Sequence, residues 1–206
     1  MALTVFFVRH GHAENNRDGF FPDDQRFDYK LTEKGVEQAK QAAELLYDSK
    51  AEAIFSSPVY RAYQTAQIIG ERLSLNVIKD ERLREVELGN LKNAQTKEIF
   101  ENDPDWFMEY FNVKTVYGLE KYDSIRRRML DFVKSLFEKG YTRVIAVSHL
   151  EPIRALVTLP LNVTGKEVRK IEIHNASIST LRFEDPGLNE IRILSVDCVP
   201  INRFFS

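Results

Sequence analysis

The sequence predicts an α/β protein: a three-layer α/β/α sandwich with a largely parallel central sheet and a small helical cap. Short β-branched and aromatic runs alternate along the chain with longer segments of helical periodicity, and the chain contains no internal repeat or low-complexity tract. A length of 206 residues suits one domain with a cap, and a hydrophobic share of 43% is ordinary for a globular protein. We therefore expect a single domain over residues 1–206, with residues 90–121 inserted as a cap segment.

The first half of the chain alternates strands with helices. Thr4–Val8 (TVFFV) is too short for a helix, and its β-branched and aromatic residues predict a buried strand. Thr32 is a candidate N-cap for a helix over Val36–Tyr47, which is rich in Ala, Gln, Glu and Leu. The other predicted elements of this half are a strand at Ala51–Ser56, a helix from Pro58 to about Arg72 and a short strand at Asn76–Lys79.

Residues 90–117 differ from both flanking regions, because they combine many aromatic residues with scattered acids and little aliphatic material. The aromatic residues are Phe100, Trp106, Phe107, Tyr110, Phe111 and Tyr117. We expect a pair of short helices that lie over the domain and cover an organic group.

The second half begins with an amphipathic helix over Tyr122–Phe137, whose apolar residues recur at helical spacing. Val144–Val147 is the clearest strand of the chain, and a helix is expected to open near Pro152. Two closing strands are predicted at Ser177–Phe183 and Ile191–Val196.

Charge and cysteine content exclude several classes of function. Lys+Arg 29 against Asp+Glu 31 gives a formal net charge of −2, so neither nucleic acid nor a membrane is an expected partner. The single cysteine, Cys198, rules out an internal disulfide and any thiolate-rich metal cluster. No apolar run approaches the roughly 18 residues of a membrane span, and no convincing signal peptide is present, so a cytoplasmic location is the default expectation.

The candidate chemistry lies at the ends of predicted strands. His10 and His149 each follow a strand, and ligands of open α/β sheets bind beyond the carboxyl ends of the strands. Neutral imidazole is a nucleophile near neutral pH, and arginine matches the oxygens of a phosphate. Arg9 precedes His10, Gly11 lets the backbone approach a ligand, and Arg61 stands at the start of a predicted helix. This combination indicates phosphoryl transfer.

With these residues the chain resembles the histidine phosphatase superfamily, also called phosphoglycerate mutase-like. The resemblance covers nearly the whole chain, and its motifs occur in the order found in the family. They are Arg9-His10-Gly11 with Asn16, LTEKGVEQA (31–39), SSPVYRAYQTA (56–66), ERLREVELGN (81–90) and VSHLEPIRAL (147–156).

The resemblance implies a role for each matching residue. His10 would be the nucleophile that becomes phosphohistidine, and Glu85 would protonate the leaving oxygen and then activate water. Arg9, Arg61, Asn16 and His149 would surround the phosphate, with the arginines and a charged His149 neutralising its charge. The resemblance thus implies catalysis by His10, Glu85 and His149 without a metal or another cofactor.

The sequence departs from the family's usual pattern at several positions. His12 and Ala13 replace an acidic residue or Gln and a Ser or Thr, and Leu150 replaces the Gly that usually follows the second histidine. Glu151 would repel a second substrate phosphate if it faced the pocket, but it would also suit the first turn of a helix. The predicted substrate-pocket residues are His12, Trp106, Tyr110, Phe111 and Leu150, with His12 expected at the rim.

Some alternatives stay open at this stage. Glu87 would be the proton donor in place of Glu85 if the register of the segment ERLREVELGN against the family motif is off by two residues. A cofactor-dependent phosphoglycerate mutase is the alternative to a phosphatase with a broad or unknown small-molecule substrate. The phosphatase is preferred because the chain has only about thirty residues between Glu85 and Gly118.

Two remote hypotheses assign the chain neither a histidine-dependent phosphatase nor a mutase activity. His10-Gly11-His12 could belong to a metal-dependent hydrolase, although few histidines remain to complete such a site. A non-catalytic phosphate-binding module is the other reading. The expected partner is a small phosphorylated metabolite, and a homodimer is an open expectation.

Overall fold

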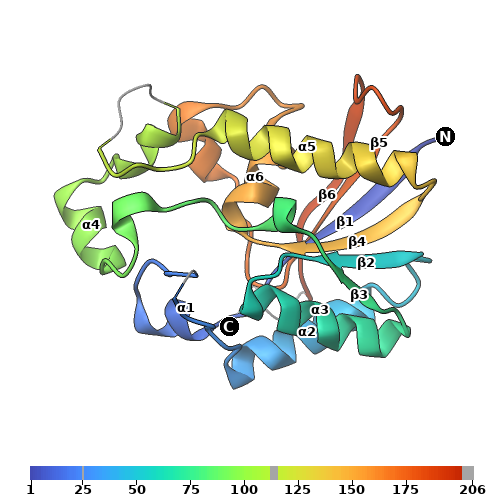
Figure 1. Ribbon diagram of the computed structural model, residues 1–206, viewed down its shortest axis with the longest axis horizontal. Helices are drawn as coiled ribbons and strands as arrows, with labels where there is room; N and C mark the ends of the chain where they lie inside the picture. Colours follow the sequence, from blue (N-terminus) through green and yellow to red (C-terminus); the bar gives the residue numbers. More distant parts are fainter. Residues whose placement is uncertain (25, 112–115, 201–206) are drawn as a thin grey trace.

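The computed structural model describes residues 1–24, 26–111 and 116–200; residues 25, 112–115 and 201–206 lie outside the described part. Its centre is a six-stranded sheet in the order β3-β2-β4-β1-β5-β6 (Figure 1). The strands are β1 (Leu3–Arg9), β2 (Ala53–Ser56), β3 (Val77–Lys79), β4 (Arg143–Ser148), β5 (Ile178–Phe183) and β6 (Ile191–Cys198). β3, β2, β4 and β1 are parallel, whereas β5 is antiparallel to both β1 and β6. The largely parallel sheet confirms the predicted class.

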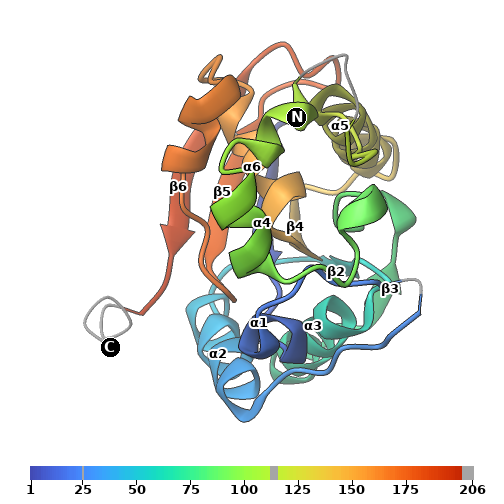
Figure 2. The ribbon, with the colours of Figure 1, turned by 90° about the vertical axis from the view of Figure 1, so that its left-hand side faces the viewer.

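Helices cover both faces of this sheet (Figures 1 and 2). α2 (Glu33–Leu45) and α3 (Tyr60–Leu73) lie on one face, and α5 (Tyr122–Glu138) and α6 (Leu150–Thr158) lie on the other. The alternation of side chains along β1 supplies both cores: Val5 and Phe7 join the cluster that contains α5 and α6, and Val8 joins the cluster of α2 and α3.

Most predicted boundaries agree with the structure, and the exceptions are small. Thr32 is the N-cap of α2, where its Oγ1 accepts a hydrogen bond from the Gly35 N–H at 3.2 Å. Pro58 was expected inside α3 but precedes the N-cap Val59, and α6 begins at Leu150 rather than at Pro152. Proline fits both places because it is tolerated before and within the first helical turn, where its missing N–H has no intrahelical partner.

The loop after β1 rests directly on the start of α2. A Cβ atom added at Gly11 would lie 2.5 Å from the carbonyl oxygen of Gly35, and one added at Gly35 would lie 2.0 Å from the carbonyl oxygen of His12. Only glycine allows two backbones to approach this closely. The segment that carries His10 is therefore held by backbone contact with α2, and the short helix α1 (Glu14–Asp18) follows it.

Residues 90–121, which we call the cap segment, contain α4 (Thr96–Asn102) and the 3₁₀-helix η3 (Trp106–Tyr110). These are the two short helices that the aromatic composition predicts. α4 lies beyond the carboxyl end of β1 in Figure 1 and stands in front of α6 and β4 in Figure 2. Three further 3₁₀-helices complete the elements: η1 (Glu81–Leu83), η2 (Gly89–Leu91) and η4 (Gly165–Lys170).

The two ends of the cap segment meet in a short backbone junction, which we call the cap stem (residues 87–90 and 117–120). The Asn90 N–H donates to the Tyr117 carbonyl at 2.7 Å, and the Glu120 N–H donates to the Glu87 carbonyl at 2.9 Å. The buried carboxylate of Glu109 accepts four backbone N–H groups of residues 116–119, at 2.7 to 2.9 Å. These bonds tie the returning chain to η3 and lower the pKa of Glu109.

Within the described residues, no helix combines the length and the apolar character needed to cross a membrane. Cys198 is exposed at the end of β6 with a free thiol.

Candidate active site

His10 and His149 follow neighbouring parallel strands and therefore come together at one edge of the sheet. β1 pairs with β4 up to Arg9 and Ser148, so the next residue of each strand is one of the two histidines. Their ring centroids lie 5.2 Å apart, and both side chains are buried. The proximity that the two strand ends predict is confirmed.

Hydrogen bonds determine which nitrogen of His10 is reactive. Nδ1 lies 2.8 Å from the carbonyl oxygen of Gly11, and because a carbonyl only accepts, Nδ1 must carry the proton. Nε2 then holds a lone pair, and it accepts a hydrogen bond from Arg61 Nε at 3.1 Å. Burial, and next the charges of Arg61 and Arg9, place the pKa of His10 well below its usual value. His10 is thus a neutral imidazole with an unprotonated Nε2, and this lone pair becomes available for attack on an electrophile when the Arg61 Nε–H turns from it to the substrate.

In the free site, the contacts of His149 favour its neutral form, whereas the resemblance implies a charged residue beside a bound phosphate. Its Nδ1 accepts a hydrogen bond from Arg61 Nη2 at 3.3 Å, and its Nε2 lies 2.9 Å from Ser57 Oγ. Burial, followed by the charge of Arg61, places the pKa of His149 well below its usual value. Arg61 therefore supplies the fixed positive charge between the two rings, in a side chain that is only 1% exposed.

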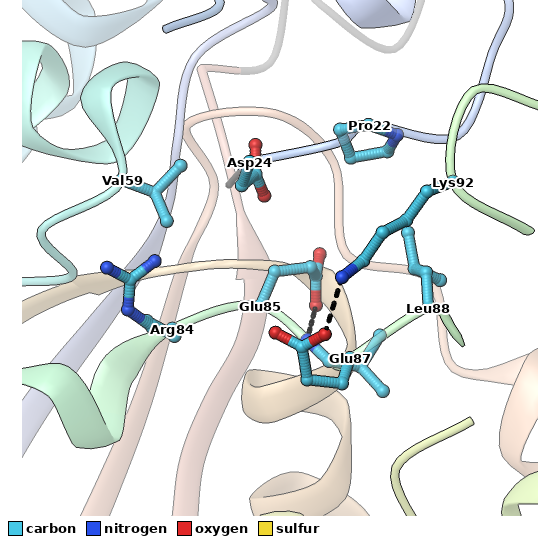
Figure 3. Close-up of a pocket in the computed structure, with 9 residues that line it drawn as sticks. Pro22, Asp24, Val59, Arg84, Glu85, Glu87, Leu88 and Lys92 are labelled. Carbon is cyan, nitrogen blue, oxygen red and sulfur yellow. Dashed lines mark hydrogen bonds and ion pairs between the residues drawn. The ribbon is translucent and has the colours of Figure 1, made fainter. Parts of the chain in front are cut away.

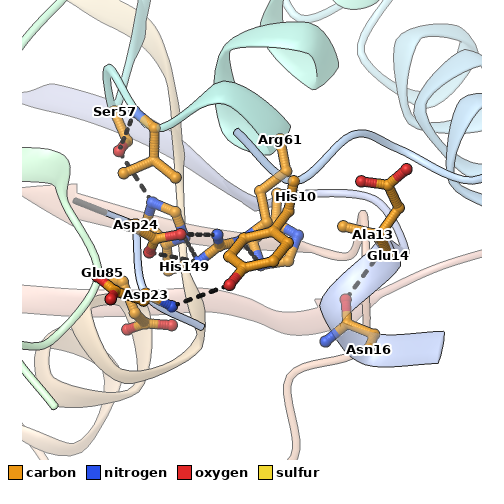
Figure 4. A network of polar contacts seen from close by, with 12 residues as sticks. His10, Ala13, Glu14, Asn16, Asp23, Asp24, Ser57, Arg61, Glu85 and His149 are labelled. Atoms are coloured by element: carbon orange, nitrogen blue, oxygen red, sulfur yellow. Dashed lines mark hydrogen bonds and ion pairs between the residues drawn. The ribbon is translucent and has the colours of Figure 1, made fainter. Parts of the chain in front are cut away.

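The outer edge of Arg61 is occupied by a residue of the chain itself. Asp24 forms a two-point ion pair with this guanidinium, through Nη1 and through Nη2 at 3.0 Å (Figure 4). Its carboxylate is 15% exposed and lies in the loop that leads from α1 to α2. An anion that binds Arg61 through the same edge has to displace Asp24.

Glu85 lies in the wall of the same site and Glu87 does not, so the structure favours the first of the two candidate acids. The Glu85 carboxylate accepts a hydrogen bond from the Val86 N–H at 2.9 Å, and burial raises its pKa to about 7. Glu87 is exposed and forms an ion pair with Lys92 at 2.9 Å (Figure 3). Asp24 and Glu85 both border the small hollow of about 20 Å³ that Figure 3 shows.

Arg9 completes the positive side of the site. Its Nη1 donates to the Ile173 carbonyl at 2.7 Å, and burial lowers its pKa to about 10, so that Arg9 remains charged at neutral pH. Its buried Nε has no hydrogen-bond partner among the described residues. A bound anion would supply an acceptor close to this group.

A cavity of about 230 Å³ opens from His10 toward the cap segment. The predicted residues that line it are Arg9, His10, Asn16, Arg61, Glu85, Trp106, Tyr110 and Leu150. His149 is fully buried behind Arg61 and is not part of the lining. Asn16 accepts the Ala13 N–H at 3.1 Å through its Oδ1, which stabilises the turn into α1.

Two residues expected in this pocket lie outside its lining. The ring of His12 points to Thr32, with Nδ1 3.0 Å from Oγ1, because its backbone runs along the start of α2. Phe111 packs on Tyr122, with ring centroids 4.7 Å apart, and faces a separate surface pocket. In contrast, Glu151 lines the cavity and also lies in the first turn of α6. The two expectations for this residue, facing the pocket and beginning a helix, are therefore both met.

Sequence reasoning missed three charged residues of the site: Asp24, Arg154 and Arg169. Arg154 donates to Glu151 at 2.7 Å and to the Ile171 carbonyl at 3.0 Å, which balances the carboxylate of Glu151. A spacing of three residues on a helix is a signal for the Arg154–Glu151 pair. Asp24 lies in an irregular loop and Arg169 in the short 3₁₀-helix η4, and neither segment has a periodicity that shows which way a side chain points.

No group of three or more His, Cys, Asp and Glu side chains able to hold a metal ion occurs in the described part of the chain. His12 turns away from His10 toward Thr32, so the H-x-H pair does not converge on one point. This geometry weighs against a metal-dependent hydrolase.

Comparisons with known proteins give one consistent picture. Residues 5–194 match the model of the histidine phosphatase superfamily (branch 1). The chain is 32% identical over 182 residues to a 2,3-bisphosphoglycerate-dependent phosphoglycerate mutase of Thermoplasma acidophilum, covering 87% of each chain. It is 31% identical over 201 residues to phosphoserine phosphatase 1 of Hydrogenobacter thermophilus, covering 95% of this chain and 93% of that protein. A mycobacterial glucosyl-3-phosphoglycerate phosphatase structure superimposes with a TM-score of 0.82 at 26% identity, covering 96% of this chain and 100% of that one.

Proposed function

Because the chain belongs to the histidine phosphatase superfamily and is one of its enzymes, we propose that it hydrolyses small phosphomonoesters through a phosphohistidine on His10, without a metal ion. The observation that carries the proposal is the unprotonated Nε2 of His10, which lies beside the Arg61 guanidinium in a residue that lines the cavity. We also propose that residues 90–121 act as an inserted cap of a single domain.

The residues in place suffice for both chemical steps. In the first step Nε2 of His10 attacks phosphorus, the bond from phosphorus to the ester oxygen breaks, and that oxygen takes the proton of Glu85. In the second step the Glu85 carboxylate takes a proton from water, the resulting oxygen bonds to phosphorus, and the phosphorus–nitrogen bond breaks. His10 and protonated Glu85 are thereby restored, and inorganic phosphate leaves.

Positive charge for the transferred phosphoryl group comes from Arg9 and Arg61. Both are oriented before substrate arrives, Arg9 by the Ile173 carbonyl and Arg61 by the two histidine rings. Preorganised donors of this kind stabilise developing negative charge without a metal ion. His149 is uncharged in the free site, and a phosphate dianion beside it would raise its pKa and favour its protonation.

The cavity favours hydrolysis over mutase chemistry. A mutase has to hold a bisphosphorylated intermediate, and in this cavity the carboxylate of Glu151 would face the second phosphate. Arg154 is already paired with Glu151, so its charge is not available in full. The mutase remains the second candidate because a relative that is 32% identical carries that name.

The test is to measure phosphate release and mutase turnover on one preparation, with a panel of phosphomonoesters and with 3-phosphoglycerate plus 2,3-bisphosphoglycerate. We expect phosphate release to exceed mutase turnover. Fast interconversion of phosphoglycerates with negligible phosphate release would reverse the assignment, and dependence on added zinc or manganese would contradict the metal-free mechanism.

The ion pair between Asp24 and Arg61 predicts that Asp24 competes with phosphate. In Asp24→Asn the neutral amide no longer competes as an anion, and we expect inorganic phosphate to inhibit with an inhibition constant about 10-fold lower, since a charge-assisted hydrogen bond contributes roughly 1.5–3 kcal/mol. Asp28→Asn is the matched control, because it removes the same charge from an exposed position of the same loop. Equal inhibition constants in both variants would show that Asp24 does not compete.

A further inference from the structure

The end of the cavity that lies against the cap segment holds a second cationic group, Arg169 of η4. Its guanidinium lies over the rings of Phe100, Trp106 and Phe107, at 5.0, 5.7 and 4.6 Å from the ring centroids. Arg169 lines the cavity together with Phe100 and Trp106, and the same cavity is lined by His10 and Arg61. Three aromatic faces fix the plane of the guanidinium and leave its N–H groups at the edge for other acceptors.

Arg169 differs from the other arginines of the cavity in lacking an acceptor. Arg9 donates to Ile173, Arg61 to Asp24 and Arg154 to Glu151. Among the described residues, neither a carboxylate nor a carbonyl accepts a hydrogen bond from Arg169. Desolvation lowers its pKa, so the free protein carries at this position a cost that the nearby charge of Glu151 offsets only in part. A ligand anion would offset that cost.

A second donor in the same wall also lacks a partner. The indole of Trp106 is 6% exposed, and its Nε1–H has no acceptor within the described part of the chain. Trp106 lies against Arg169, so one acceptor-rich group placed here could serve both residues after a small adjustment. Buried donors without acceptors are rare in native proteins and indicate a place where water, an ion or a ligand binds.

The charges of this region distinguish a carboxylate from a second phosphate. Glu151 lines the cavity near Arg169, and its charge raises the pKa of Arg169 although the two side chains form no ion pair. A dianionic phosphate would meet that carboxylate with only one unpaired arginine to compensate. A carboxylate carries a single charge and matches the planar edge of one guanidinium.

We propose that Arg169 recognises a carboxylate at the far end of the substrate, so that the enzyme acts on small organic phosphomonoesters that also carry a carboxylic acid. This inference rests on the proposed function, because it assumes that the phosphate is held at His10. The body of the substrate would pack on the aromatic side chains of the cap segment, and the two anionic ends would bind Arg61 and Arg169.

The test uses pairs of phosphomonoesters that differ in the carboxylate: phosphoserine with phosphoethanolamine, and 3-phosphoglycerate with glycerol 3-phosphate. For at least one pair we expect kcat/KM to be about 10- to 100-fold higher for the acid, mainly through KM. Arg169→Gln should remove this preference and leave the hydrolysis of the partner without a carboxylate, and of p-nitrophenyl phosphate, unchanged within about 3-fold. Arg169→Lys should restore part of it.

Lys170→Gln is the matched control, because it removes one positive charge from the neighbouring exposed position of η4. Trp106 gives a binding readout that does not depend on turnover, since it is the only tryptophan of the chain. In a His10→Ala background, 3-phosphoglycerate should change its fluorescence more than glycerol 3-phosphate does, and Arg169→Gln should abolish the difference.

The outcomes separate the two proposals. If no phosphomonoester is hydrolysed, the proposed function is wrong, and the fluorescence titration still decides the carboxylate site. If p-nitrophenyl phosphate is hydrolysed but no pair shows a preference, or Arg169→Gln weakens both members of each pair equally, the carboxylate site is wrong. Tighter binding of propanediol bisphosphate than of phosphoserine and 3-phosphoglycerate would assign Arg169 to a second phosphate. That result would also contradict the carboxylate site.

Discussion

His10→Ala is expected to lower phosphatase turnover by about 10⁴-fold or more, because the substitution removes the nucleophile rather than one of several supporting groups. The variant should also fail to form the phosphoenzyme. When the protein is mixed with a ³²P-labelled phosphomonoester and quenched with alkali, label should stay on the unaltered protein and be released by acid, as expected of a phosphorus–nitrogen bond. The variant should retain no label.

The matched control is His12→Ala, which removes a histidine two residues along the chain that lies outside the cavity lining. It should keep turnover within a few-fold and should still trap label. Circular dichroism and direct binding of inorganic phosphate, measured by tryptophan fluorescence, would show that His10→Ala is folded. Retained turnover in a folded His10→Ala protein would refute the central assignment.

Glu85→Gln is expected to separate substrates by the basicity of their leaving groups. An alkoxide needs a proton to depart, so alkyl phosphates should lose about 10²- to 10⁴-fold in kcat/KM. p-Nitrophenolate is a weak base that departs unaided, so its release in the first step should be nearly normal. Water attack in the second step also needs the carboxylate, and the variant should therefore give a burst of about one p-nitrophenolate per site followed by slow turnover.

The raised pKa of Glu85 adds a pH signature. The acid form is required in the first step, and with a pKa of about 7 it falls to half at pH 7 and declines about tenfold for each further pH unit. For alkyl phosphates the wild-type kcat/KM should decrease accordingly above pH 7, and Glu85→Gln should lose this dependence.

Glu87→Gln is the control for both measurements, because Glu87 is exposed and paired with Lys92. It should behave as the wild-type protein does. If alkyl and aryl phosphates fell equally in Glu85→Gln, or if Glu87→Gln gave the burst instead, Glu85 would not be the proton donor.

The raised pKa of Glu85 supplies the acid form for the proposed first step, but it lowers the stability of the folded protein as the pH rises. Between the ordinary carboxyl value near 4.5 and about 7, the folded protein holds a proton on Glu85 that the unfolded chain has released. The free energy of unfolding therefore decreases with rising pH through this window as far as Glu85 is concerned. The acid that catalysis requires is thus a residue that destabilises the free protein at neutral pH.

The sequence could predict whatever depends on local pattern and on strand order. The run Thr4–Val8 identified β1, and the placement of His10 and His149 after parallel strands was enough to bring the rings together. The motif positions also placed Arg61 and Glu85 in the cavity. These inferences succeed because a parallel sheet brings the carboxyl ends of its strands to one edge.

What could not be predicted depends on tertiary contacts of irregular segments. Nothing local shows that Asp24 reaches Arg61, which is 37 residues away in the chain. The neutral state of His149 follows from complete burial beside a cation, and burial of a single ring is not visible in a sequence. Tyr110 and Phe111 both pack against the buried ring of Tyr122, but only Tyr110 lines the cavity. A difference of one residue at the end of η3 thus decides which ring reaches the cavity.

The cap stem has a consequence for how this scaffold can change its specificity. Because Asn90 and Tyr117 are joined by a backbone hydrogen bond, the segment between them leaves the domain and returns at nearly the same point. A segment of different length could replace residues 91–116 if its ends closed through the same backbone hydrogen bond between Asn90 and Tyr117. The entropic cost of a longer segment is small, because doubling the length of a loop costs about 0.6 kcal/mol. We therefore expect the cap segment to be exchangeable: its replacement would change one wall of the cavity and leave the histidines and arginines where the sheet holds them.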